Sequence, residues 1–298
     1  MYPRAFDYCV ARSVEEALEL LSRYGDDARA LAGGQSLIPL MKLRLASPSR
    51  LIDIGRIANL THIAQSDKGL AVGALATHAG VLTSPIVRGQ WPLMADAASV
   101  IGDSQVRNWG TVGGALAEAD PASDWGAAAL ALRARLRCAS TRGERVLDAD
   151  GFFIDAYTTR LAPDELITEV IFPTPRQPAA GAYLKLERRA GDFAVVSIAL
   201  QLTLEKNSVC RDASIALAAA GLTPISALDA AASLIGKELN PHVIGEAAER
   251  VAAEAEPAVD IRGSEEYKRA AAAALFKQAV EVVLRRARGE KVEAGHAR

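Results

Sequence analysis

The chain begins with apolar residues spaced for one face of a helix. They recur at i, i+3, i+4 and i+7 between Val14 and Leu21, just after the capping-box sequence Ser13-Val14-Glu15-Glu16. Apolar runs at residues 28–32 and 51–54 predict two strands, and residues 37–43 between them predict a short helix. The first 55 residues therefore read as a small α/β unit.

The next stretch, residues 56–175, has a longer mixture of helical and strand patterns. Strands are predicted at residues 70–74, 136–139 and 166–172, and helices at residues 92–101 and 124–132. The last strand ends at Pro173, where three prolines within six residues favour an extended connector. The hydrophobic pattern thus predicts a domain over residues 1–175, with subdomains at about 1–55 and 56–175.

Beyond the connector the composition changes, and a second domain is predicted over residues 179–288. Its strands are expected at residues 182–188, 195–204 and 209–219, and its alanine-rich helices at 227–235, 241–255 and 264–288. This order predicts an α+β domain, with a three-stranded antiparallel sheet and a bundle of helices. Residues 289–298 are charged and are expected to form a flexible tail.

Composition narrows the classes of function. The chain has 298 residues and a formal net charge of −2, which fits two domains and excludes the basic surface of a nucleic-acid-binding protein. No apolar run reaches the ~20 residues of a membrane helix, and the N-terminus lacks the apolar stretch of a signal peptide. A cytoplasmic location is the expectation.

Metal-binding patterns are absent from the sequence. The three cysteines, Cys9, Cys138 and Cys210, are widely separated and are expected to be buried, reduced thiols. The four histidines are scattered and form no paired-ligand motif. Any redox chemistry is therefore expected without a metal centre of the chain's own.

Two segments with adjacent glycines carry the functional signal. One is Ala32-Gly33-Gly34-Gln35-Ser36 and the other is Thr111-Val112-Gly113-Gly114-Ala115. Each is expected to be a turn that follows a strand, with bare N–H groups that can bind phosphate oxygens. The alternative from spacing alone is a pair of ordinary tight turns, since the sequence contains neither GxGxxG nor GxxxxGK[ST].

Longer blocks around these glycines resemble one family. Residues 32–44, residues 105–114 followed by Asp120-Pro121 and Asp124, and residues 183–192 are similar to the FAD-binding medium subunit of molybdenum hydroxylases. Gly263, Tyr267 and Lys268 resemble the signature of its C-terminal domain. The family includes aerobic carbon monoxide dehydrogenase, nicotine and quinoline dehydrogenases and the FAD segment of xanthine dehydrogenase. The blocks occur in family order over nearly the whole chain.

The resemblance implies a fold and a set of cofactor contacts. The fold would be the FAD-binding vanillyl-alcohol-oxidase (PCMH) type, with two α/β subdomains in residues 1–175 and a separate C-terminal domain. FAD would bind without a covalent bond, because neither glycine segment contains a histidine. No catalytic residue and no metal ligand is expected. The residues expected to contact FAD are Ala32, Gly33, Gly34, Gln35, Ser36, Leu37, Ile101, Gln105, Thr111, Val112, Gly113, Gly114, Ala115, Asp120, Asp124, Ile167 and Lys185.

Several of these residues have simpler readings without the family. Asp124 could cap a helix, Lys185 could be a solvated strand residue, and Gln105 could lie on the surface. Ala115 and Trp109 depart from the family pattern, because relatives often carry a polar residue and an arginine there. These departures put two possible contacts in doubt but leave the glycines in place.

The resemblance also implies partner subunits. A molybdopterin-binding large subunit would oxidise the substrate, and a small subunit with [2Fe–2S] clusters would pass electrons to FAD and on to an external acceptor. The assembly would be a heterotrimer or a dimer of heterotrimers, and its substrate could be carbon monoxide, an N-heterocycle, a purine or an aldehyde. The alternatives are a stand-alone flavin oxidase of the same fold, with Tyr183 or Arg188 as its acid or base, and a flavin-free scaffold protein.

Overall fold

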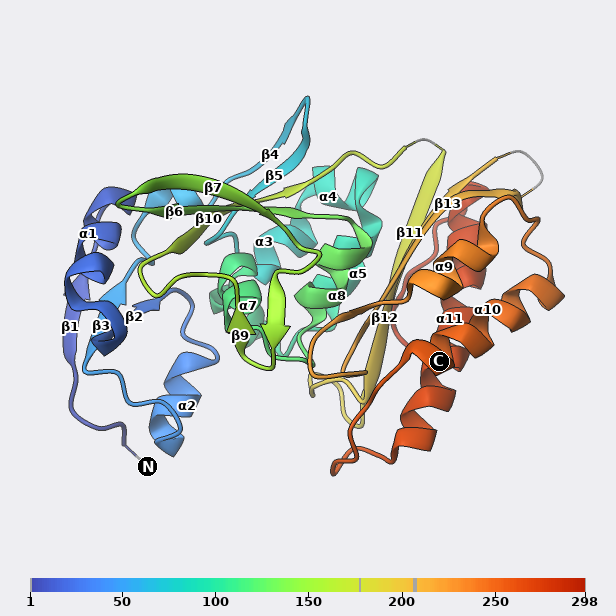
Figure 1. Cartoon of the computed structure of the whole chain (residues 1–298). Helices are drawn as coiled ribbons and strands as arrows, with labels where there is room; N and C mark the ends of the chain where they lie inside the picture. The colour runs from blue at the N-terminus through green and yellow to red at the C-terminus, as the bar shows by residue number, and fades with distance from the viewer. Residues whose placement is uncertain (1, 177, 206–207, 298) are drawn as a thin grey trace.

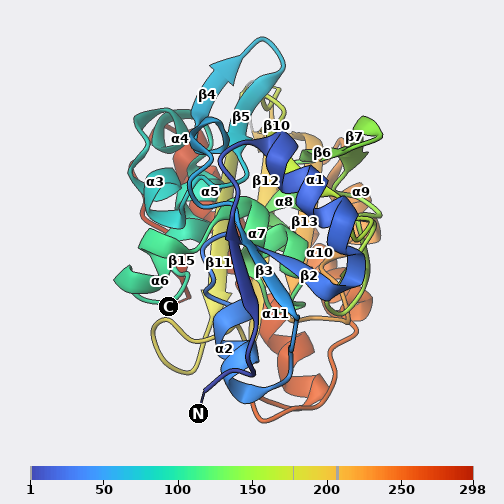
Figure 2. The same ribbon diagram turned by 90° about the vertical axis from the view of Figure 1, so that its left-hand side faces the viewer.

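A computed structural model describes residues 2–176, 178–205 and 208–297, and its main sheets follow one another along the molecule (Figure 1). The first is a parallel sheet of order β1-β3-β2, which Figure 2 shows from its end of the molecule. Its strands are β1 (Asp7–Val10), β2 (Ala28–Leu31) and β3 (Arg50–Asp53), joined through α1 (Val14–Tyr24) and α2 (Leu37–Leu43).

The predicted capping box of α1 is confirmed in its Ser13 half, whereas Glu16 binds the amide of the residue before the N-cap. The amide of Glu16 donates to Ser13 Oγ at 3.2 Å, and Glu16 Oε2 accepts from the amide of Arg12 at 2.7 Å. The apolar face of the helix, including Leu18 and Leu21, is buried in a core of its own.

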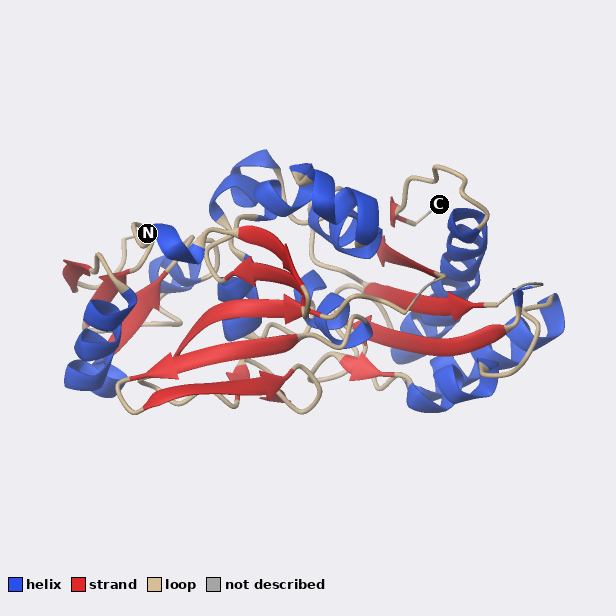
Figure 3. Ribbon diagram, turned by 90° about the horizontal axis from the view of Figure 1, so that it is seen from above, coloured by secondary structure: helices blue, strands red, loops and turns tan. Residues whose placement is uncertain are grey.

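The middle region contains an antiparallel sheet of order β4-β5-β10-β6-β7, with helices packed beside it (Figure 3). The strands are β4 (Ile63–Ser66), β5 (Gly69–Gly73), β6 (Arg135–Ser140), β7 (Gly143–Asp148) and β10 (Leu166–Phe172), with a small hairpin of β8 (Phe153–Asp155) and β9 (Thr158–Thr159). The helices are α3 (His78–Thr83), α4 (Pro85–Gln90), α5 (Pro92–Ser99), α6 (Ser104–Trp109), α7 (Val112–Glu118) and α8 (Asp124–Ala131).

The second glycine segment differs from its prediction as a turn after a strand. It follows helix α6, and Gly113 and Gly114 lie in the first turn of α7. Thr111 caps this helix, because its Oγ1 accepts from the amide of Gly114 at 3.1 Å. This segment is therefore the buried, capped N-terminus of a helix, where the sequence predicted a tight turn.

The C-terminal region has a sheet of order β14-β13-β12-β11-β15. The predicted three antiparallel strands are its long members, β11 (Ala179–Leu186), β12 (Val196–Leu204) and β13 (Cys210–Ala218), and the two-residue strands β14 (Ile225–Ser226) and β15 (Gly295–His296) extend it. The helices are α9 (Leu228–Leu234), α10 (Pro241–Glu254) and α11 (Glu265–Ala287).

The two faces of this sheet belong to different cores. Leu184 and Ile198 are packed in one cluster with residues of α10 and α11, whereas Tyr183 and Ala199 are packed in the core of the middle region. Because neighbouring strand residues point to opposite faces, the sheet joins the C-terminal helices to the rest of the molecule.

The predicted flexible tail is partly ordered over its described residues, 289–297, which corrects that part of the expectation. Gly295 and His296 pair in parallel with Leu184 and Lys185, and the amide of Ala297 donates to the carbonyl of Lys185 at 3.0 Å. Arg286 at the end of α11 donates to the carbonyl of Val292 at 2.7 Å and is ion-paired with the buried Asp96 at 2.6 Å. Main-chain hydrogen bonds to strand β11 keep this segment in place. The charged composition of the segment does not predict such pairing.

Candidate functional site

A cavity of about 400 Å³ lies where the two glycine segments meet. Its walls also include residues of β2 and β10, the two residues that follow β5, and the loops around β8 and β9. A larger depression of about 590 Å³ near Tyr267 is more open to solvent and contains neither glycine segment. Eleven of the predicted residues line the cavity: Ala32, Gly33, Gly34, Gln35, Ser36, Leu37, Thr111, Gly113, Gly114, Ala115 and Ile167.

The glycines allow the two segments to touch. A Cβ on Gly33 would lie 1.9 Å from the carbonyl oxygen of Trp109, just before the second segment. One on Gly113 would lie 2.5 Å from the Cβ of Ala74. Gly34 has φ of 71°, a backbone conformation that other residues rarely adopt. The cavity therefore depends on glycine at both segments.

The first segment has hydrogen-bond donors to spare. In the part of the chain that the structure describes, the amides of Gly33, Gly34, Gln35 and Ser36 donate no hydrogen bond to a protein group. All four residues line the cavity. Successive free amides on a concave surface are suited to the oxygens of an anion such as a diphosphate.

The second segment is different, because most of its amides already have acceptors. The amides of Val112 and Gly113 donate to the carbonyls of Ala76 and Ala74, at 3.0 and 2.9 Å, and the amide of Ala115 donates to the carbonyl of Thr111 at 3.0 Å. The amide of Gly114 donates to Thr111 Oγ1. The expectation of bare N–H groups is therefore wrong here. The Thr111 hydroxyl, which accepts one bond, keeps its own hydrogen for a ligand.

Six predicted residues are not among the described residues that line the cavity: Ile101, Gln105, Val112, Asp120, Asp124 and Lys185. Val112 is fully buried in the core, and Gln105 is exposed on α6. The carbonyl of Ile101 accepts from Arg107 Nη1 at 3.0 Å. Asp120 accepts from the hydroxyl of Tyr157 at 3.3 Å, and Tyr157 does line the cavity.

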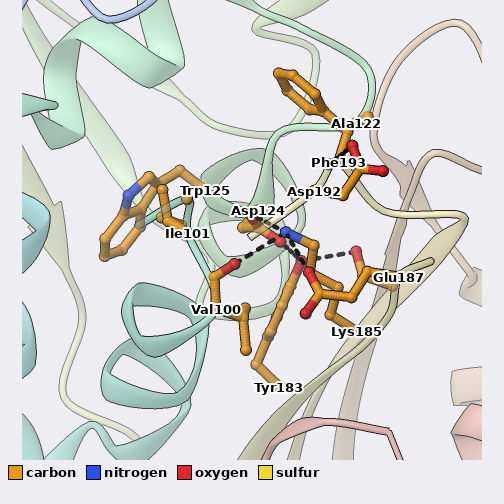
Figure 4. Close-up of polar contacts among 12 residues, drawn as sticks. Val100, Ile101, Ala122, Asp124, Trp125, Tyr183, Lys185, Glu187, Asp192 and Phe193 are labelled. Carbon is orange, nitrogen blue, oxygen red and sulfur yellow. Dashed lines mark hydrogen bonds and ion pairs between the residues drawn. The ribbon is translucent and has the colours of Figure 1, made fainter. Parts of the chain in front are cut away.

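Asp124 and Lys185 meet in a buried polar cluster between α8 and β11 (Figure 4). Lys185 Nζ lies 3.0 Å from the carbonyl oxygen of Val100, 3.3 Å from Asp124 Oδ2 and 3.6 Å from Glu187 Oε2. The Tyr183 hydroxyl lies 2.6 Å from Asp124 Oδ1. The side chain of Lys185 is 2% exposed, so the simple reading as a solvated strand lysine is wrong.

Burial controls the protonation of this cluster. Burial raises the pKa of Asp124, and the neighbouring Lys185 ammonium opposes that change. Burial and the Asp124 carboxylate together raise the pKa of Tyr183 well above its usual value. Tyr183 therefore stays a neutral donor, which does not suit it to be the base of a stand-alone oxidase. Asp124 is the first residue of α8 and not its cap, because Ser123 occupies the N-cap position.

Sequence reasoning missed His78, which lines the cavity although it is 4% exposed. Thr77 caps α3 by accepting from the amide of Gly80 at 3.1 Å. The local sequence therefore offered a threonine N-cap followed by His78 as the first helical residue. That signal places the residue on α3 but does not reveal its position beside the cavity.

Two family patterns match the chain along most of its length. Residues 4–175, which contain both glycine segments, match the FAD binding domain in molybdopterin dehydrogenase. Residues 181–283 match the CO dehydrogenase flavoprotein C-terminal domain. The chain belongs to this family of FAD-binding flavoproteins. It is thus related to the medium FAD subunits of molybdenum hydroxylases, as the sequence predicts.

Individual relatives agree in length as well as in sequence. The chain is 39% identical to the carbon monoxide dehydrogenase medium chain of Hydrogenophaga pseudoflava, over 94% of this chain and 97% of the relative. It is 40% identical to the glyceraldehyde dehydrogenase medium chain of Sulfolobus acidocaldarius, over 90% of this chain and 95% of the relative. These flavoproteins are oxidoreductase subunits of enzymes with different substrates.

Solved structures of the family confirm the predicted fold class. Carbon monoxide dehydrogenase from Hydrogenophaga pseudoflava, solved without the Mo-pyranopterin moiety of its cofactor, superimposes with a TM-score of 0.93 at 38% identity, covering 96% of this chain and 99% of that one. Quinoline 2-oxidoreductase from Pseudomonas putida 86 superimposes with a TM-score of 0.90 at 34% identity, covering 97% and 99%. Among the described residues of this flavoprotein, no helix is long and apolar enough to cross a bilayer.

Proposed function

We propose that this flavoprotein is the electron-transfer subunit of a cytoplasmic, heterotrimeric molybdenum-containing dehydrogenase. In this proposal a molybdopterin-binding large subunit oxidises the substrate, and a small subunit with [2Fe–2S] clusters supplies the electrons that leave through FAD to an external acceptor. The observation that carries the proposal is the cavity of about 400 Å³ with four free amides in its first glycine segment. Relatives named as medium chains support the same assignment.

The residues of the cavity fit an FAD diphosphate. The amides of residues 33–36 would donate to its oxygens, and the Thr111 hydroxyl would donate from the opposite segment. Gly113 and Gly114 would contribute close approach of the backbone, and Leu37, Ala115 and Ile167 an apolar wall. Bound FAD would supply the exchange between one-electron and two-electron transfer, which no amino-acid side chain provides.

The remaining predicted contacts are assigned to the flavin end of the site. Ile101, Gln105 and Asp120 would flank it, and Asp124 would hold Lys185 in place. A lysine beside the flavin would raise its reduction potential, because the cation stabilises negative charge on the reduced cofactor. This assignment rests on the family resemblance alone, because the 3.3 Å contact joins Lys185 to Asp124 and not to the cavity.

Native purification tests the proposal. The protein is purified from its own host without denaturation, its visible spectrum is recorded, and the co-purifying chains are identified. Flavin bands together with a molybdenum protein and a small iron–sulfur protein are expected. A yellow single chain that oxidises a small alcohol would instead identify a stand-alone oxidase, and a chain that stays colourless after FAD reconstitution would identify a scaffold protein.

A further inference from the structure

His78 occupies the point where the two glycine segments meet. Its amide donates to the carbonyl of Gly110 at 3.1 Å, and its side chain lies against the same residue. A Cβ on Gly110 would be 2.6 Å from His78 Nε2, so the missing side chain is what lets the imidazole edge reach this point. A Cβ on Gly33 would in turn be 3.0 Å from the Cα of Gly110, which places this edge beside the first segment.

The proton of the imidazole has only one position in this arrangement. The indole Nε1–H of Trp125 donates to His78 Nδ1 at 3.0 Å. An indole N–H is a donor only, so Nδ1 must accept and the proton must sit on Nε2. Trp125 is fully buried, and its ring centroid lies 6.1 Å from that of His78, so both rings are held in place.

The Nε2–H group has no acceptor in the described parts of the chain. The only hydrogen bond of the ring there is the one from Trp125, and His78 is among the residues that line the cavity. Nε2 is not among the buried side-chain atoms that lack a partner, so this donor reaches the open space of the cavity, where a ligand can accept its hydrogen. Burial, and to a smaller extent Arg107, lowers the pKa of His78 to about 4, so the imidazole is neutral near pH 7.

We infer that His78 donates a hydrogen bond from Nε2 to an oxygen of the FAD diphosphate, with Trp125 as the positioning residue that fixes the tautomer. The inference rests on the proposed function of the cavity and deepens it. The second glycine segment uses the amides of Val112, Gly113 and Gly114 within the protein. His78 therefore supplies a donor on the side where backbone donors are scarce.

Affinity for FAD separates this inference from the proposed function. The dissociation constant is measured by quenching of flavin fluorescence on the full chain, for the unaltered protein and for His78→Phe, which keeps an aromatic ring but removes the donor. The substitution is expected to weaken binding 10- to 100-fold, and His78→Gln, which restores an N–H donor, should recover part of the loss. His242→Phe is the control, since this side chain is 83% exposed on α10 and its substitution should leave affinity unchanged.

The outcomes are distinguishable. If the unaltered chain binds no FAD, the proposed function fails. If the unaltered chain binds FAD and His78→Phe binds it equally well, the role of His78 is wrong and the proposed function stands. Equal losses for His78→Phe and His78→Gln would also contradict the donor role.

A spectroscopic measurement covers the case in which His78→Phe does not fold. In protein labelled with ¹⁵N-histidine, nitrogen shifts between pH 6 and 8 should report the Nε2–H tautomer, and Trp125→Phe should allow a mixture of tautomers. Addition of FAD should shift the Nε2 resonance. An Nδ1–H tautomer in the unaltered protein, or an Nε2 resonance that FAD does not move, would overturn the inference.

Discussion

The cavity at the glycine segments and the cluster around Lys185 treat their polar groups in opposite ways. In the cavity, four successive amides donate to no group among the described residues. In the cluster, Lys185 has contacts to Val100, Asp124 and Glu187, and Tyr183 is bonded to Asp124 and Ser197. The sequence presents both as cofactor contacts. The difference teaches that unused donors indicate a ligand site, whereas a paired cluster first of all fixes the architecture.

The largest effect is expected when the paired cluster is broken. Lys185→Met keeps most of the side-chain volume but leaves the Asp124 carboxylate buried without its cation. Removing one partner of a buried ion pair costs about 3–5 kcal/mol of unfolding free energy. Denaturant unfolding of the FAD-free protein measures this loss, with Lys277→Met on the exposed side of α11 as the control.

The same variant has a pH signature. Burial raises the folded-state pKa of Asp124, so its contribution to stability is lost as pH rises through the raised pKa. Without Lys185 the pKa rises further, and the deficit of Lys185→Met should be smaller at pH 5 than at pH 8. Unfolding identical to that of the unaltered protein at both values would show that the cluster does not hold the fold together.

The second prediction concerns pH and the unused nitrogen of His78. Its folded pKa of about 4 lies below the value near 6.5 of the unfolded chain, so the unfolded state binds more protons between these values. His78 therefore contributes stability that is complete above pH 6.5 and lost as pH falls towards 4, up to about 3 kcal/mol. Chemical denaturation of the unaltered protein and of His78→Gln at several pH values measures the difference. Parallel pH profiles for the two proteins would contradict the buried neutral state.

The third prediction concerns the cavity and its affinity for FAD. Gly33→Ala places a methyl group 1.9 Å from the carbonyl oxygen of Trp109 and must separate the two segments. FAD affinity should fall at least 100-fold, about 3 kcal/mol of binding free energy. Gly89→Ala is the matched control, because a Cβ there meets no atom within 4 Å. Retained flavin in Gly33→Ala would mean that the contact between the segments is not part of the site.

Much of the fold was predictable where apolar residues form long patterns. Helix α2 and strand β10 have the predicted limits, residues 37–43 and 166–172, because mostly apolar segments define them. Helix α7 has two glycines in its first turn, and glycine has a low helix propensity, so the second glycine segment was misread as a turn. The two-residue strand β15 depends on main-chain pairing, which leaves no pattern in side chains.

The candidate site was predictable only where it is local in sequence. The first glycine segment is a continuous stretch, and family resemblance points to it directly. The contact of Tyr183 with Asp124 spans 59 positions, and that of Trp125 with His78 spans 47. Such pairs depend on the packing of whole elements, so the sequence could not show that Asp124 is paired or that His78 lies beside the cavity.

The smallest predicted effect compares one hydroxyl from each glycine segment. Thr111 Oγ1 caps α7 through the amide of Gly114, whereas Ser36 precedes α2 without a side-chain capping bond. Thr111→Ala should lower the unfolding free energy of the FAD-free protein by about 1 kcal/mol, and Ser36→Ala should leave it unchanged. Thr111→Ser keeps the cap and serves as the control. Equal losses of unfolding free energy for Thr111→Ala and Ser36→Ala would mean that both hydroxyls stabilise the fold to the same extent. The distinction between a first segment that binds the ligand and a second segment that supports the structure would then be wrong.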